Sequence, residues 1–217
     1  MALISLDPNA ALVLVDLQKA IAQAAPAQPV IAHAAQLAEA FRSHGLTVVL
    51  VQLASRHGST APGRTDMPRP QHQTCTSPSD WHHIVDELAG HPDDILITKR
   101  NWGAFYGTDL DLHLRRRHIS QIVLGGVATS IGVESTARSA HEHGYHLALV
   151  VDAMADLDPI SHQHSIEKIF PRLGQITTSA EILTLLAARE KSDPLPAQPF
   201  VPPAQLGEPG SPQSRHA

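Results

Sequence analysis

Cysteine is almost absent from this chain of 217 residues, because Cys75 is the only one. A disulfide within the chain and a cysteine-rich zinc site are therefore excluded. No hydrophobic run approaches the roughly 20 residues that a membrane-spanning helix needs. The first residues, MALIS, show neither a charged leader nor a cleavable apolar run. The sequence thus predicts a cytoplasmic protein that has no membrane partner.

Aromatic residues are also scarce, at 4% of the chain, and 16 basic residues are outnumbered by 21 acidic ones. This composition disfavours both a surface on which bases stack and a basic face that follows a phosphate backbone. The 15 histidines are scattered along the chain rather than gathered in one motif. We expect a small-molecule substrate and no nucleic-acid partner.

Apolar runs alternate with segments of helical periodicity, and this alternation is typical of a parallel α/β sheet. The predicted fold has three layers: a six-stranded, mostly parallel sheet with helices on both faces. One domain spans residues 1–190, and residues 191–217, which hold seven of the 17 prolines, are predicted to be a disordered tail. Strands are expected at 11–15, 46–51, 95–98, 122–125, 147–151 and 175–177, and helices at 29–44, 110–117, 130–143, 159–170 and 179–189.

Polar residues follow three of the predicted strands at the point where each strand ends. Asp16 follows the first strand, Lys99 the third, and a glycine-containing turn at 125–132 the fourth. The carboxyl ends of parallel strands meet at one edge of an α/β sheet, and ligands bind there. A carboxylate and an ammonium beside backbone N–H groups can form an acid–base pair next to an anion-stabilising turn. The structural alternatives are that Asp16 caps a helix and that Lys99 lies on the surface.

Several segments, taken in order, resemble the isochorismatase-like hydrolase superfamily, which includes isochorismatases, nicotinamidases and N-carbamoylsarcosine amidohydrolases. The similarity extends over about residues 8–187. It implies a Rossmann-like three-layer fold, a non-proline cis peptide bond at Val127–Ala128 and a homo-oligomer, a dimer or larger. The matching segments are 11–18 (ALVLVDLQ), 98–105 (TKRNWGAF), 107–110 (GTDL), 126–138 (GVATSIGVESTAR), 144–145 (GY) and 152–154 (DAM).

Thiol-dependent members of this superfamily have an Asp–Lys–Cys triad, and Asp16 and Lys99 match its first two positions. The third position falls on Gly132, so this chain has no thiol there. Cys75 lies in a proline-rich loop at residues 54–80, far from the motif, and we do not expect it to act as the nucleophile. Similarity to the cysteine-free isochorismatases implies hydrolysis by water. Asp16 would be the acid. Lys99 would maintain the charge state of Asp16 and bind the substrate's carboxylate.

The function stays open between three interpretations. The first is a hydrolase that cleaves a vinyl ether or a C–N bond of a small metabolite with water and an Asp–Lys pair. The second is a non-catalytic pseudoenzyme of the same fold that binds a small molecule or acts through oligomer contacts. The third is a nicotinamidase-related amidase, which Gly132 disfavours. An acid that works near neutral pH needs a raised pKa, whereas a nearby lysine lowers it, and the sequence does not decide between these effects.

The remaining candidates are assigned to the substrate pocket. Aromatic walls would suit a small cyclic substrate, and packing in the core is the alternative. Residues 80–83 (DWHH) superficially resemble the metal site of nicotinamidases, but they lead into a helical pattern at 84–88. We predict neither a metal nor a cofactor. The predicted substrate-binding residues are Gln18, Gln52, Trp102, Phe105, Val127, Ala128, Thr129, Ser130 and Ile131.

Overall fold

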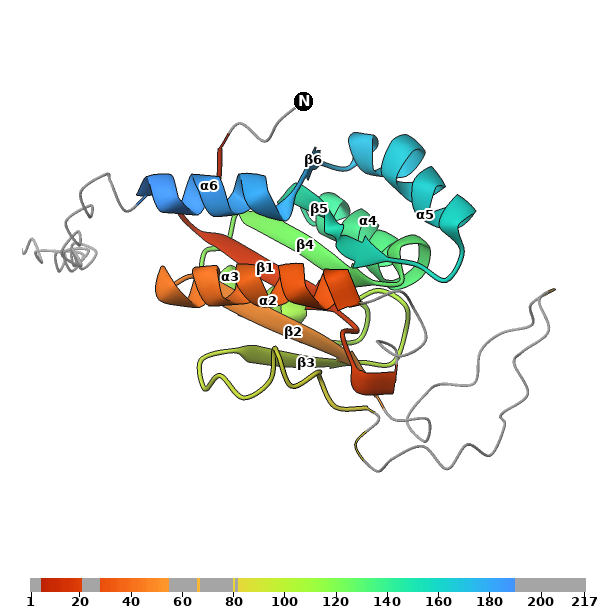
Figure 1. Cartoon of the computed structure of the whole chain (residues 1–217), viewed down its shortest axis with the longest axis horizontal. Helices are drawn as coiled ribbons and strands as arrows, with labels where there is room; N and C mark the ends of the chain where they lie inside the picture. Colours follow the sequence, from red (N-terminus) through yellow and green to blue (C-terminus); the bar gives the residue numbers. More distant parts are fainter. Residues whose placement is uncertain (1–4, 21–27, 55–65, 67–79, 81, 190–217) are drawn as a thin grey trace, which may run out of the picture.

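Six parallel strands form the centre of the molecule in the order β3-β2-β1-β4-β5-β6 (Figure 1). This confirms the predicted six-stranded sheet. The computed structural model describes residues 5–20, 28–54, 66, 80 and 82–189. Cys75, most of the predicted loop and the predicted tail therefore lie outside the described residues. The strands are β1 (Ala10–Val15), β2 (Thr47–Leu53), β3 (Ile95–Lys99), β4 (Gln121–Val127), β5 (His146–Ala155) and β6 (Gln175–Thr177).

Helices cover both faces of this sheet, which confirms the predicted three-layer α/β fold. One face carries α2 (Gln28–Ser43) and α6 (Ser179–Arg189), and the other carries α3 (Leu110–Arg116) and α4 (Glu134–Glu142) (Figure 1). Every residue of β1 is buried, because this strand is central and a helical layer covers each of its faces. Burial on both faces explains why β1 is an unbroken apolar run rather than an alternating one.

The helix predicted at 130–143 is present, but it starts in a different form. Its first turn is a π-helical segment, η2 (Thr129–Val133), and α4 follows it directly. The carbonyl of Ala128 accepts hydrogen bonds from the N–H groups of both Ile131 and Val133, at 3.2 and 3.1 Å. Such π-helical turns occur mostly inside α-helices and often at functional sites. The predicted helix at 159–170 is likewise divided, into α5 (Pro159–His164), η3 (Ser165–Ile169) and η4 (Phe170–Arg172).

Strand β5 continues past Asp152, where we expected it to end. Its pairing with β4 shifts register between Leu124 and Gly126, so β5 takes up additional residues in a bulge and then pairs again as far as Ala155. A polar residue usually ends a buried strand. The bulge instead lets Asp152 leave the ladder and find partners outside it.

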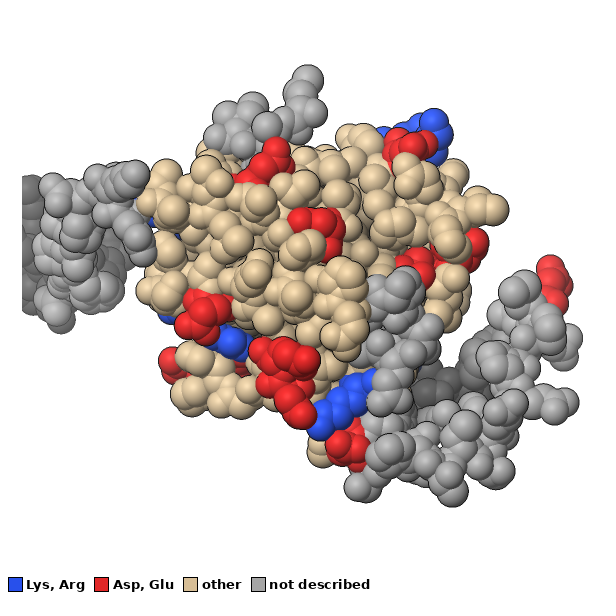
Figure 2. All heavy atoms as spheres, viewed as in Figure 1, with Lys and Arg blue, Asp and Glu red and all other residues tan. Residues whose placement is uncertain are grey.

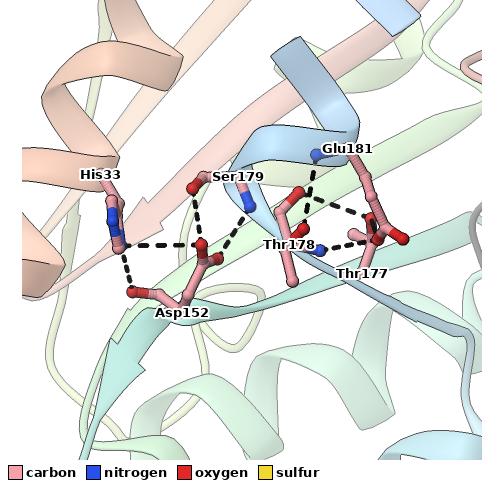
Figure 3. Close-up of polar contacts among 6 residues, drawn as sticks. All are labelled: His33, Asp152, Thr177, Thr178, Ser179 and Glu181. Atoms are coloured by element: carbon pink, nitrogen blue, oxygen red, sulfur yellow. Dashed lines mark hydrogen bonds and ion pairs between the residues drawn. The ribbon is translucent and has the colours of Figure 1, made fainter. Parts of the chain in front are cut away.

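The partners of Asp152 lie on the two helices of the α2 and α6 face, and their side chains point toward it (Figure 3). Ser179 N and Oγ donate to the carboxylate at 2.8 and 2.6 Å, so Asp152 caps the start of α6. His33 Nδ1 lies 2.7 Å from the Asp152 carbonyl oxygen; that oxygen only accepts, so Nδ1 carries the hydrogen. The serine and the histidine both bind the aspartate, an arrangement that does not activate a serine nucleophile.

Charged side chains are spread thinly over the face that carries α2 and α6 (Figure 2). Basic and acidic groups are interspersed on this face, and the basic ones do not form a continuous patch. Within the described part of the chain, no helix has the length and apolar character required to cross a membrane.

Candidate active site

Asp16 and Lys99 form an ion pair at the carboxyl edge of the sheet, as their positions at strand ends predict. Lys99 Nζ lies 2.6 Å from Asp16 Oδ2. The strands that carry them, β1 and β3, are not neighbours, because β2 lies between them. The backbone of Asp16 turns away from the ladder at a left-handed φ of 55°, a region that aspartate tolerates better than most residues. Its N–H still donates to the carbonyl of Val51 in β2, at 2.8 Å.

Lys99 is buried to an extent that is rare for a lysine, with 1% of its surface exposed. Its ammonium group donates to Asp16 Oδ2 and to the backbone carbonyl of Trp102, at 2.6 Å in each case. An ammonium group has three donors, so one donor remains beyond these two contacts with described residues. The alternative of a surface lysine is therefore wrong, and the pair is built into the interior of the site.

Burial raises the pKa of Asp16 to about 6, and this effect exceeds the charge and the hydrogen bond of Lys99, which both lower it. The other carboxylate oxygen, Asp16 Oδ1, is buried and has no hydrogen-bond partner among the described residues. A buried acceptor without a partner costs about 1–3 kcal/mol, and a bound proton or a donor group on a ligand would remove that cost. A carboxyl group with this pKa can give or take a proton near neutral pH.

Gly132 completes this site from the other side of the sheet edge. It lies in η2, which follows the end of β4. A Cβ placed on Gly132 would lie 3.1 Å from Lys99 Nζ and 3.3 Å from Asp16 Oδ2. The position that the resemblance assigns to a nucleophilic cysteine is thus directly against the Asp–Lys pair. In this chain that position presents a backbone Cα, and an added Cβ would lie closer to the pair than an ordinary van der Waals contact.

Gln18 has a structural role that its sequence position did not reveal. Its side chain is fully buried. Nε2 donates to the carbonyls of Leu53 and His82, at 3.2 and 2.6 Å, and Oε1 accepts from Leu53 N at 2.8 Å. Gln18 also forms an antiparallel bridge with Ile84, and residues 82–90 form turns instead of the predicted helix. Backbone groups thus hold both amide hydrogens of Gln18, and contact of this residue with the substrate stays a prediction.

We expect Gln18→Leu to lower the free energy of unfolding by about 2–4 kcal/mol, because it leaves the Leu53 and His82 groups unpaired in the interior. Gln52→Leu is the matched control. Gln52 makes one hydrogen bond, to the exposed Thr98 side chain, so its loss should change stability by no more than about 0.5 kcal/mol. Urea denaturation of the two variants measures both values. Equal losses would contradict the anchoring role of Gln18.

Two other predicted pocket residues lie away from the pair. Gln52 and Leu50 are two residues apart in β2, so their side chains point to the same face of the sheet, where Leu50 packs in the core under α2. Ile97 and Lys99 of β3 point to the opposite face. Successive strand residues alternate between faces, so Gln52 does not reach the Asp16 carboxylate. Phe105 is in the core, where its ring stacks on His143 at a centroid distance of 5.0 Å. The structure therefore places both side chains away from the Asp16–Lys99 pair, and their contact with the substrate stays an untested prediction.

Trp102 lies beside the pair through its backbone, which accepts a hydrogen bond from Lys99. Its side chain is 70% exposed, so it is not a core residue. The role of its carbonyl group could not be predicted from the sequence, because that role depends on the path of the chain after β3. The exposed indole remains a candidate wall of the pocket.

The segment 127–131 leads from the end of β4 into η2, which carries Gly132. The peptide bond between Val127 and Ala128 is cis, as the resemblance implied. Val127 is buried and Ala128 packs against the same core, while Ile131 is 42% exposed. The side chains of Thr129 and Ser130 bind groups on another element, which is described below. Substrate contact by these five residues stays a prediction.

The residues suggested as a possible metal site have another use. Asp80 binds Lys19 Nζ at 3.0 Å, and the same ammonium group binds Asp86 at 2.9 Å. Among the residues that the structure describes, no group of three or more His, Cys, Asp or Glu side chains is placed to hold a metal ion. The chemistry that this geometry supports is proton transfer and charge stabilisation by the Asp16–Lys99 pair.

Comparison with known proteins agrees with this geometry. The sequence model of the isochorismatase domain matches residues 10–181. An uncharacterised isochorismatase family protein of Bacillus subtilis, YwoC, is 43% identical over 174 residues, which cover 80% of this chain and 92% of the relative. The ureidoacrylate amidohydrolase RutB of Stutzerimonas stutzeri is 31% identical over 69% of this chain and 71% of its own. The solved structure of an isochorismatase family protein from Burkholderia thailandensis superposes with a TM-score of 0.77, at 39% identity over 84% of this chain and 98% of that one.

Proposed function

The chain belongs to the isochorismatase family of hydrolases, and from this premise we propose that it cleaves a small metabolite by direct attack of water at the Asp16–Lys99 pair, without a cysteine nucleophile. The observation that carries the proposal is Gly132. Its backbone lies where a nucleophilic side chain would contact both charged groups, 3.1 Å from Lys99 Nζ and 3.3 Å from Asp16 Oδ2 as measured to an added Cβ. A covalent route through this position requires a thiol that the chain does not supply there.

The charged pair supports a division of labour between its two groups. Lys99 is held by Asp16 and by the Trp102 carbonyl, and its third donor is available to polarise an oxygen of the substrate. Asp16 Oδ1 has no described partner and is the oxygen that can carry the transferred proton. We propose that the reacting water or a substrate oxygen approaches the two charged groups beside Gly132, where no side chain intervenes.

A vinyl ether fits this pair best among the candidate bonds. The protonated Asp16 carboxyl would donate its proton to the terminal carbon of the enol ether, which leaves positive charge on the ether-bearing carbon. Water would add to that carbon and return a proton to Asp16. The resulting hemiketal would break its C–O bond and release an alcohol and a ketone. One water is consumed and the catalytic groups return to their starting state, so no cofactor takes part.

The pH dependence of turnover tests this proposal. Asp16 must be protonated to act as the acid, and its pKa is raised to about 6. The active fraction should therefore fall from about nine tenths at pH 5 to about one hundredth at pH 8, a decrease of roughly a hundredfold in kcat/KM. Initial rates with isochorismate, measured across this range, report the profile. A rate that rises through pH 6 would contradict the acid role.

That rising profile is the expected signature of the second candidate, an amidase in which ionised Asp16 takes a proton from water. The observation that favours it is the similarity to a protein named as a ureidoacrylate amidohydrolase. Small amides, including ureido compounds, therefore belong in the same screen. If no vinyl ether and no amide is turned over, the non-catalytic alternative is favoured, and the proposal fails.

The remaining predictions on partners follow from the proposed function and the resemblance. We propose a small-molecule substrate, a cytoplasmic location and a homo-oligomer. Exposed apolar side chains beside the site, those of Trp102, Ile131 and Ile160, are compatible with a contact between copies of the chain. Sedimentation of the purified protein measures the oligomeric state.

A further inference from the structure

The segment from Asp156 to Ser165 holds η2 from outside through side-chain hydrogen bonds. Asp156 Oδ2 accepts from Ser130 N at 2.7 Å and from Ser130 Oγ at 2.8 Å. His162 Nδ1 lies 2.8 Å from the hydroxyl of the fully buried Thr129. Further along, Ser165 Oγ donates to Glu134 Oε2, at 2.6 Å. These contacts fall at the start of η2 and immediately after its end.

The contacts matter because η2 carries Gly132. The gap between Gly132 and the charged pair is narrow: an added Cβ would lie 3.1 Å from Lys99 Nζ, closer than an ordinary van der Waals contact. A shift of η2 by a few tenths of an ångström would therefore change what fits beside Lys99. The backbone of η2 does not contact β1 or β3 through ladder hydrogen bonds, since it follows the end of β4. Hydrogen bonds from a neighbouring segment therefore add to the core packing of Val133 in holding η2 in place.

We propose that Asp156 is a positioning residue that holds η2, and with it Gly132, against the Asp16–Lys99 pair. Asp156 is the best placed of the three contacting side chains, because one carboxylate oxygen binds both the backbone N–H and the hydroxyl of Ser130. Hydrogen bonds to an ionised carboxylate are about twice as strong as neutral ones. Its second oxygen accepts from Asp158 N at 3.2 Å, which ties the carboxylate to the turn before α5.

This inference rests on the proposed function for the identity of the site, but its test does not need turnover. Gly132→Cys in a Cys75→Ser background leaves one thiol, beside Lys99 Nζ. The Lys99 ammonium lowers a thiol pKa below its usual value of about 8.5, and the Asp16 carboxylate, 3.3 Å from the added Cβ, raises it when ionised. The thiol pKa therefore reports the position of η2 relative to both charged groups. The added Cβ needs the side-chain ends of Lys99, Asp16 and Val15 to move by a few tenths of an ångström. The thiol pKa is read from the rate of alkylation by iodoacetamide against pH, by mass spectrometry of the full chain.

We expect Asp156→Ala in this reporter to raise the thiol pKa by about one unit and to slow alkylation at pH 7 by about tenfold. Asp156→Asn keeps the shape and one acceptor oxygen, and should restore most of the reactivity. Asp158→Ala is the matched control. Asp158 accepts from Ile160 N and Ser161 N at the start of α5 and, among the described residues, makes no side-chain hydrogen bond to η2, so its loss should shift the thiol pKa far less than the loss of Asp156.

A folded Asp156→Ala reporter with the parent's thiol pKa would overturn the proposal, as would an equal shift in the Asp158→Ala control. If Asp156→Ala does not fold, Ser130→Ala decides. It removes one of the two contacts with Asp156 and should raise the thiol pKa by part of the same shift, whereas no shift would reject the positioning role. A chain that turns over no substrate but shows the Asp156 effect would reject the proposed function alone.

Discussion

Asp16→Asn should reduce kcat/KM by about a thousandfold, because it removes the proton that the reaction requires and little else. General acid–base catalysis contributes about 10²–10⁴ to a rate. Asparagine has nearly the same shape as aspartic acid, and its Oδ1 can still accept the hydrogen bond from Lys99 Nζ, which now spans 2.6 Å to the carboxylate. The side chain keeps its place but cannot exchange a proton near neutral pH.

The free energy of unfolding helps to separate this effect from a loss of structure. The raised pKa of Asp16, about 6 against an ordinary value of 3.8, means that the folded state prefers the protonated form. The stability that this preference provides is fully present below about pH 3.8 and is lost as pH rises through about 6. A neutral asparagine does not carry this pH dependence. The variant should therefore lose the stability change between pH 4 and pH 7, which thermal denaturation at the two pH values measures.

Asp111→Asn is the matched control for activity. Asp111 is also an aspartate held by a cation, with its Oδ1 3.2 Å from Arg115 Nε, and it accepts a hydrogen bond from Tyr145. Neither partner belongs to the candidate site, so its turnover should stay within about twofold of the original. An Asp16→Asn variant that keeps more than a tenth of the activity would remove Asp16 from the mechanism.

The sequence was sufficient for the pair itself. Asp16 follows the buried strand β1, and Lys99 ends β3, which lies at the side of the sheet. Parallel strands bring their carboxyl ends to one edge, so a parallel fold places both residues at that edge. Their separation by β2 was not predictable in the same way. Strand order depends on how helices cross over the sheet, and the apolar runs of β1, β2 and β3 are too similar to determine it.

The glutamines show why the rest of the site was harder to predict. Gln18 and Gln52 are equivalent in the sequence, since each lies near the end of a buried strand. Gln18 is buried and donates hydrogen bonds to backbone carbonyls of Leu53 and His82. Gln52 points to the face of the sheet opposite Lys99. The burial of Gln18 depends on where the turn that contains His82 packs against the end of β1. The orientation of Gln52 depends on the pleat of β2 relative to β3, which requires the register.

The pKa of Asp16 and the role of Asp156 depend on packing that no local pattern contains. Two effects of opposite sign act on Asp16, and only the depth of burial decides between them. Asp156 lies beyond the expected end of β5, because the bulge that extends this strand leaves no periodic signal in the sequence. The pKa of Asp16 and the role of Asp156 therefore became visible only in the folded structure.

Gly126→Ala should prevent folding or lower the free energy of unfolding by more than about 4 kcal/mol. Gly126 lies in β4 at a φ of 127°, which residues with a side chain rarely adopt, and it pairs with Val15 of β1. An added Cβ would meet the backbone of Val15, 2.2 Å from its carbonyl oxygen and 2.5 Å from its nitrogen. Backbone atoms of a central strand cannot move aside as a flexible side chain can, so the cost falls on the β1–β4 ladder itself.

The matched control for this prediction is Gly144→Ala. Gly144 also has a positive φ, 83°, but no heavy atom outside its own neighbours lies within 4 Å of an added Cβ. Its cost should be limited to the backbone preference, about 1 kcal/mol. Guanidinium denaturation of both variants separates the cost of the steric clash from the cost of the backbone conformation. Similar losses in the free energy of unfolding would show that the close approach of β4 to β1 is tolerated. Because Val15 directly precedes Asp16, a partly folded Gly126→Ala chain should also show a displaced Asp16–Lys99 pair, and its turnover should fall further than its folded fraction.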